Sequence, residues 1–108
     1  MSFLCPECGG KTLVIEESLD LGADDTYDER ALQVVSCGSC GFTGAALYEE
    51  SRRGSLGSES VNHTGYSVPE DILAMVENDI RSGAMSSGLQ ERIREYGSFR
   101  IVYAPEKS

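Results

Sequence analysis

Four cysteines in this 108-residue chain have the type and spacing to do chemistry. They form two Cys-x-x-Cys pairs, one in the segment CPECGG and the other in CGSCG. Such a turn brings two thiolates to one point, and the glycine that follows each pair allows the backbone to direct amides toward the sulfurs. Two such turns predict one tetrahedral metal site made of Cys5, Cys8, Cys37 and Cys40.

The donor set also indicates which metal the site would bind. Thiolates favour soft or borderline ions, and zinc is the usual occupant of a closed four-cysteine site. We therefore expect a structural zinc ion, because four protein ligands leave no open position for a catalytic water. Iron held by the same four sulfurs is the metal alternative. Thiol redox chemistry is a further alternative, but in thioredoxin-like proteins a Cys-x-x-Cys pair opens a helix after a strand, and neither pair here has that context.

Three segments rich in β-branched and aromatic residues flank the cysteine turns. Residues 11–15 follow the first turn, and residues 31–35 and 42–48 lie on either side of the second. Their composition predicts strands. Turn, strand, loop, strand, turn and strand in this order resemble the zinc-ribbon family of the CPxCG type over about the first half of the chain. The resemblance implies a three-stranded antiparallel sheet with two cysteine knuckles and a bound zinc ion, but it implies no particular function, because such ribbons serve many processes.

The stretch between the cysteine turns is acidic. From Glu16 to Glu29 there are seven acidic residues and no basic one. We interpret the stretch as a solvated hairpin loop, because clustered like charges favour an extended segment. Its spacing does not match a calcium-binding loop.

The last two acidic residues of this stretch offer a second hypothesis. Asp28 and Glu29 stand nine and eight residues before Cys37. This placement resembles the Asp-Glu pair in the ribbon of S-II-type transcript-cleavage factors, although Asp25-Thr26-Tyr27 stand where that family has an arginine. The resemblance implies that Asp28 and Glu29 would help RNA polymerase to hold a magnesium ion and its water. A looser resemblance, through Tyr27-Asp28-Glu29 and the turn before Phe42, is to ribbons that bind a translation elongation factor.

Residues 51–67 have no apolar period and are rich in serine and glycine, so we interpret them as a connector. They contain His63, the only histidine. We interpret His63 as a surface residue or as one that lies behind the metal ligands, because four cysteines already complete the site and a base needs a nucleophile and an orienting partner.

The last third of the chain predicts two amphipathic helices and a strand. The segment Ser67-Val68-Pro69-Glu70 indicates a helix start with a capping box between Ser67 and Glu70, and Ser82-Gly83 indicates its end. A second short helix is expected between Ser87-Gly88 and Gly97. The apolar residues that carry these patterns are Ile72, Leu73, Val76 and Ile80 in the first helix, Leu89, Ile93 and Tyr96 in the second, and Phe99, Ile101 and Tyr103 in the strand.

Together these patterns predict an α+β protein. We expect a zinc ribbon at 1–50, the connector at 51–67, and at 68–108 a two-helix extension with a final strand, packed on the ribbon as one unit. At this length a modest core is possible, and a metal would add stability.

Charge and composition narrow the function. Eighteen acidic and nine basic residues give a formal charge of −9, which opposes long contact with a phosphate backbone, so nucleic acid is not the expected partner. We expect a cytoplasmic protein without a membrane span or signal peptide. No catalytic set of serine, histidine and aspartate is visible, and no Cys-His pair lies outside the turns. We therefore expect no enzyme but a protein-interaction adaptor with structural zinc; the alternative is the cleavage factor that uses Asp28 and Glu29.

Overall fold

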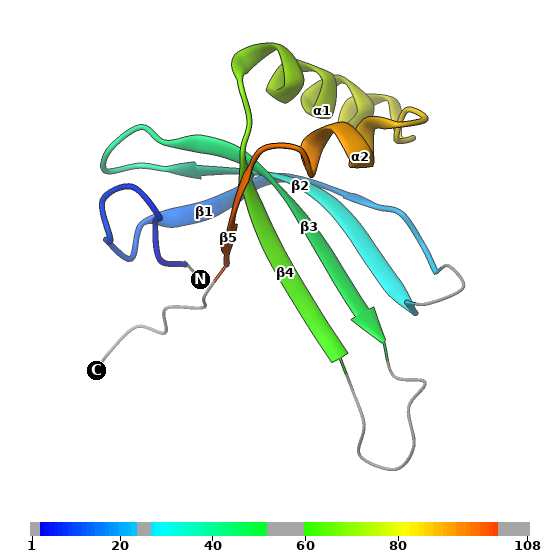
Figure 1. The fold of residues 1–108 in the computed structure, drawn as a ribbon, viewed down its shortest axis with the longest axis horizontal. Coiled ribbons are helices and arrows are strands. Elements are labelled where there is room, and N and C mark those ends of the chain that lie inside the picture. The colour runs from blue at the N-terminus through cyan, green and yellow to red at the C-terminus, as the bar shows by residue number, and fades with distance from the viewer. Residues whose placement is uncertain (1–2, 24–26, 52–59, 102–108) are drawn as a thin grey trace.

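The computed structural model describes residues 3–23, 27–51 and 60–101. Within these ranges the chain is an α+β protein with five strands and two helices (Figure 1). Their order is β1 (Leu13–Asp20), β2 (Glu29–Cys37), β3 (Thr43–Ser51), β4 (Ser60–Ser67), α1 (Glu70–Ser82), α2 (Leu89–Ile93) and β5 (Gly97–Arg100).

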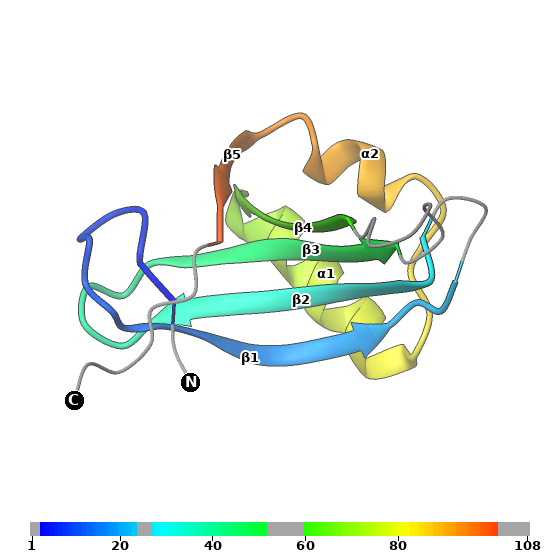
Figure 2. The same ribbon diagram turned by 90° about the horizontal axis from the view of Figure 1, so that it is seen from below.

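All five strands belong to one antiparallel sheet in which each strand pairs with the next along the chain. Both helices come from the connection between β4 and β5 and lie on the same face of the sheet (Figures 1 and 2). No helix within the described ranges is both long and apolar enough to cross a membrane.

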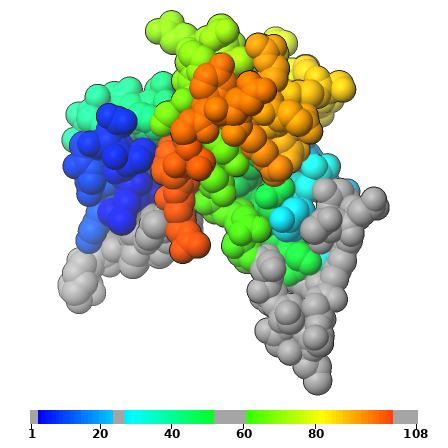
Figure 3. Space-filling model, viewed as in Figure 1, coloured from blue at the N-terminus to red at the C-terminus, as the bar shows by residue number. Residues whose placement is uncertain are grey.

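Two apolar clusters lie on opposite faces of the sheet, because successive side chains of a strand alternate between faces. The helix-side cluster packs sheet residues against α1 and α2; its buried members are Leu32, Val34, Ala45, Leu47, Tyr66, Ile72, Val76, Leu89 and Ile93. The cysteine-side cluster contains Phe3, Cys5, Leu13, Val35, Cys37, Ala46 and Ile101. It brings Phe3 of the N-terminal segment together with Ile101, the residue after β5, and Figure 3 shows the N-terminal segment beside β5.

The sheet is larger than the three-stranded ribbon that the sequence predicts, and this prediction is corrected to five strands. The segments 11–15, 31–35 and 42–48 do lie in or beside strands, but β1, β2 and β3 each run further into the acidic or polar sequence. Backbone pairing causes this extension: Asp20 pairs with Ala31, and Glu29 with Glu50. The acidic stretch is therefore mostly strand at its two ends, and the loop is shorter than expected.

Strand β4 lies in the segment that we interpreted as a connector. Two residues of β4 explain why it pairs with β3 on one side and with β5 on the other. Tyr66 fills the helix-side cluster, and Gly65 makes room for the ring of Phe99 on β5, since a Cβ at Gly65 would approach that ring to 2.3 Å. Residues 52–59 of the connector and Tyr103 of the final strand lie outside the described residues.

Helix α1 ends where the sequence indicates. Gly83 adopts a left-handed conformation with φ 87°, and its N–H donates a hydrogen bond to the carbonyl of Asp79. The predicted start is wrong in detail, because Ser67 belongs to β4 and pairs with Gly97, and no side chain caps the helix after Pro69. Helix α2 is a single short helix from Leu89 to Ile93, with both of these residues buried.

Candidate metal centre

The first cysteine turn is held by a small antiparallel bridge at the start of β1. Phe3 and Leu13 exchange backbone hydrogen bonds of 2.8 and 3.0 Å, and the N–H of Cys5 donates to the carbonyl of Gly10 at 2.9 Å. Gly9 then closes the turn with φ 74°, and its N–H donates to the carbonyl of Cys5 at 2.9 Å. The glycine is needed here because side chains disfavour this left-handed backbone.

The second turn repeats the same construction between β2 and β3. The N–H of Cys37 donates to the carbonyl of Phe42 at 2.8 Å, and that of Gly41, with φ 83°, donates to the carbonyl of Cys37 at 3.0 Å. Because Leu13 pairs with Cys37 in the sheet, the two turns lie at the same end of adjacent strands. Sheet pairing therefore positions the two turns against each other.

The four sulfurs meet in one cluster. Cys5 Sγ lies 3.6 Å from Cys40 Sγ, and Cys8 Sγ lies 3.7 Å from Cys37 Sγ. All four sulfurs lie within 4.8 Å of one another, and all four cysteines are free of disulfides. A tetrahedral zinc ion with bonds of about 2.3 Å to sulfur would separate its ligands by about 3.8 Å, so the separations of 3.6 and 3.7 Å fit such an ion. A disulfide would need about 2.05 Å.

Hydrogen bonds to Cys37 favour its thiolate. Thr12 Oγ1 lies 2.9 Å from Cys37 Sγ, and the N–H groups of Cys40 and Ser39 donate to the same sulfur at 3.4 Å. The Thr12 hydroxyl and, next, the Cys40 amide lower the pKa of Cys37 to about 6. No pattern in the sequence marks Thr12, which stands 25 residues away.

The opposite shift at Cys40 shows that its neighbours disfavour its thiolate. The N–H of Phe42 lowers the pKa of the Cys40 thiol, but desolvation and the thiols of the other three cysteines outweigh it and raise the pKa to about 12. Four adjacent sulfurs cannot all ionise alone. A divalent cation bound among them would stabilise the thiolates, because metal binding displaces their protons.

The ligands differ in exposure. Cys5 and Cys37 are each only 3% exposed and belong to the cysteine-side cluster, whereas Cys8 and Cys40 are exposed. A hollow of about 330 Å³ lies over the exposed pair and is lined also by Glu7, Gly41 and Phe42. The structure thus brings the four predicted residues into a cluster that could bind a metal ion. Zinc, in preference to iron, stays a prediction.

His63 lies outside the ligand cluster, which among the described residues consists of the four cysteines. His63 Nε2 lies 2.7 Å from Gln33 Oε1 and therefore donates to it. The rings of Phe3 and Tyr48 stand edge-on to the imidazole, with centroids at 5.5 and 5.4 Å. Burial lowers the pKa of His63. His63 is thus a partly buried contact between β2, β4 and the N-terminal segment.

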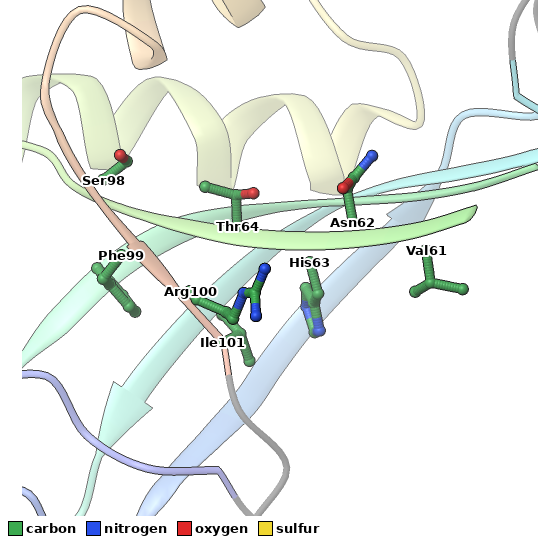
Figure 4. Close-up of a pocket in the computed structure, with 8 residues that line it drawn as sticks. All are labelled: Val61, Asn62, His63, Thr64, Ser98, Phe99, Arg100 and Ile101. Carbon is green, nitrogen blue, oxygen red and sulfur yellow. The ribbon is translucent and has the colours of Figure 1, made fainter.

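A groove of about 490 Å³ lies beside His63 where β5 crosses β4 (Figure 4). Asn62, Thr64 and Ser98 point to the helix side of β4, and Val61 and His63 point to the other side. Arg100 contributes the only formal charge in the lining, which also contains Phe99 and Ile101. His63 Nε2 bonds to Gln33, and within the described lining neither the Thr64 nor the Ser98 hydroxyl forms a hydrogen bond to His63.

Asp28 and Glu29 lie where the β1–β2 connection joins β2. The N–H of Asp28 donates to the carbonyl of Glu50 at 2.8 Å, and Glu29 pairs with Glu50 in the sheet. Within the described ranges, three acidic or histidine ligand atoms do not converge around this pair. Its role in a shared magnesium site stays a prediction.

The comparisons with known proteins add no family to this geometry: no protein-family model, curated protein or solved structure matches the chain. The resemblance of the first half to zinc ribbons therefore stays a prediction.

Proposed function

We propose that the four-cysteine cluster binds one structural zinc ion and that the protein is a small protein-interaction adaptor rather than an enzyme. The observation that carries the zinc proposal is the placement of the four sulfurs, at 3.6 and 3.7 Å across the cluster. All four positions of a tetrahedral ion would be filled by the chain, which leaves none for a substrate or a reactive water.

A bound ion would join the two cysteine turns, which come from separate parts of the chain. The first turn is attached to the sheet through the Phe3 and Leu13 bridge, and the second continues β2 into β3. Zinc would link these two turns directly. Its binding would then contribute to the stability of this end of the sheet, because the site forms only in the folded chain.

The experiment for the zinc proposal is elemental analysis of freshly purified protein, with hydrogen exchange before and after chelation. We expect one zinc per chain, and faster amide exchange at Cys5, Gly9, Cys37 and Gly41 after chelation. The amides of α1 serve as an internal control, because its buried residues belong to the helix-side cluster, which contains no cysteine. Iron in the protein, or unchanged exchange at both turns, would contradict the proposal.

Two features support an adaptor. The metal would be coordinatively closed, and the groove beside β5 offers polar side chains and the 55% exposed Val61 without a paired hydroxyl and base. Such a surface can contact another protein, whereas the formal charge of −9 disfavours nucleic acid.

The adaptor proposal is tested by photo-crosslinking in cells. A crosslinking amino acid replaces Val61 in one variant and the exposed Glu91 of α2 in a matched control. We expect one partner protein to crosslink at position 61 and not at position 91. The purified protein should capture the same partner, lose this binding after chelation, and regain it when zinc is added. The adaptor proposal would be contradicted if neither position crosslinked to a protein and the purified protein captured no partner.

A further inference from the structure

We propose that the metal centre is an oxidation site for hydroperoxides, at which exposed Cys8 and Cys40 react first and each then forms a disulfide with a buried cysteine of the opposite turn. The pairs would be Cys8 with Cys37 and Cys40 with Cys5. This inference rests on the proposed zinc site for its metal-release step, whereas the pairing rests on the sulfur positions alone.

The difference in exposure decides which sulfur reacts first. Cys8 and Cys40 are exposed beneath the 330 Å³ hollow, and a hydroperoxide is small enough to enter it. Cys5 and Cys37 are 3% exposed. Cys37 Sγ also accepts hydrogen bonds from two backbone amides and contacts the Thr12 hydroxyl, which shield it further. A bound zinc ion would hold all four cysteines as thiolates, so exposure to the oxidant decides between them and the outer pair is the reactive pair.

All four sulfurs are close to one another, and contacts between the turns supply each exposed sulfur with a buried partner. Each exposed sulfur is in direct contact with a buried one of the other turn, Cys40 with Cys5 at 3.6 Å and Cys8 with Cys37 at 3.7 Å. A disulfide needs about 2.05 Å, so each pair must close by about 1.6 Å. Disulfides between the turns would hold the two turns together in place of the metal. Disulfides within a turn would leave the two turns unlinked.

The reaction balances with the hydroperoxide as the only oxidant. The exposed thiolate attacks one peroxide oxygen, the O–O bond breaks, and with one proton the products are a sulfenic acid and water. The buried thiolate then attacks that sulfur, the S–O bond breaks, and the departing hydroxide takes a proton to become a second water. Each disulfide therefore consumes one hydrogen peroxide and two protons. Two such steps remove all four thiolates and release the metal ion.

In the test, the zinc-loaded full chain is treated with hydrogen peroxide, and a colorimetric chelator measures the zinc that is released. The remaining thiols are then blocked with N-ethylmaleimide, and the protein is digested with trypsin. Cleavage after Lys11, Arg30 and Arg52 places Cys5 and Cys8 on peptide 1–11 and Cys37 and Cys40 on peptide 31–52. Disulfides between the turns join these two peptides. Disulfides within the turns leave them separate, each lighter by two hydrogens.

We expect one zinc released for two peroxides consumed, joined peptides, and recovery of zinc binding after reduction with dithiothreitol. Separate peptides, irreversible sulfinic or sulfonic acids on Cys8 and Cys40, or zinc that stays bound after excess peroxide would overturn the proposal. Brief labelling of the zinc-loaded chain gives a second measurement: N-ethylmaleimide should modify Cys8 and Cys40 before Cys5 and Cys37, and the reverse order would contradict the assigned first step.

The individual pairs are resolved with single variants. In Cys8→Ser, peroxide should join Cys5 to Cys40 and leave Cys37 free to be blocked; in Cys40→Ser, it should join Cys8 to Cys37 and leave Cys5 free. Other pairs would overturn the assignment. Elemental analysis separates the two proposals: a chain without metal refutes the zinc site, while the peptide map of that same metal-free chain still tests the disulfide pairing.

Discussion

The two faces of the sheet are stabilised in different ways. The helix-side cluster is made of aliphatic and aromatic residues from the sheet and both helices, and it contains no cysteine. The cysteine-side cluster is smaller, and two of its seven buried members are candidate metal ligands. The comparison teaches that burial of apolar area can stabilise the helix side alone, whereas under the proposed function a cation that keeps four thiolates together would stabilise the cysteine end.

The strongest test of this comparison removes one buried ligand. Cys37→Ser should abolish stoichiometric zinc binding, because serine replaces a thiolate that accepts hydrogen bonds from two amides. Competition with a coloured chelator measures the loss. The matched control is Ser39→Ala in the same turn, since only the backbone of Ser39 contacts the sulfur. If Cys37→Ser and Ser39→Ala bound zinc with equal affinity, Cys37 would not be a required zinc ligand, and the proposed metal site would be contradicted.

The converse test weakens the helix side. Leu32 is fully buried in the helix-side cluster, so Leu32→Ala should lower the free energy of unfolding by about 2–5 kcal/mol. Urea unfolding of the zinc-loaded protein measures this change. We expect the zinc content to stay at one per chain, because Leu32 does not belong to the cysteine-side cluster. The exposed Val61→Ala is the control and should change stability by less than about 0.5 kcal/mol.

A third substitution tests how closely β5 packs on β4. The Cβ of alanine at Gly65 would lie 2.3 Å from the ring of Phe99, so Gly65→Ala should cost about 1–3 kcal/mol through overpacking. Adding Phe99→Leu should recover part of this loss, and the double-mutant cycle in urea measures the coupling. Additive effects of the two substitutions would show that the ring does not press on this glycine.

The smallest expected effect is the pH dependence contributed by His63. Burial lowers its pKa below the ordinary value of 6.5, so the unfolded chain binds the proton more readily than the folded chain. The stability from neutral His63 is present above pH 6.5 and is lost as the pH falls toward the lower folded pKa. Urea unfolding of the metal-free chain between pH 5 and 7.5 measures this slope. His63→Gln should flatten it, and an unchanged slope in His63→Gln would assign the effect to other groups.

The sequence predicts local features well where one short pattern decides them. Helical spacing predicts the burial of Ile72 and Val76, and a glycine stop predicts the end of α1 at Gly83. Together with the strand segments, these helical patterns predict the α+β class. The capping box at Ser67 fails for a physical reason: pairing of Ser67 with Gly97 extends β4 up to the helix. The local capping signal at Ser67 is overridden there by pairing with Gly97, which is 30 residues distant in the chain.

By itself, the sequence determined which residues could hold a metal, because a Cys-x-x-Cys turn sets its own geometry and glycine permits its backbone. It also determined the two helices through their period, β1, β2 and β3 through their composition, and the final strand β5 through its alternation. Only the tertiary structure decided that Ser60–Ser67 becomes β4, that Gln33 contacts His63, and that Thr12 contacts Cys37. These contacts join residues at least 25 positions apart, and such pairing depends on how the whole sheet assembles rather than on any neighbouring pattern.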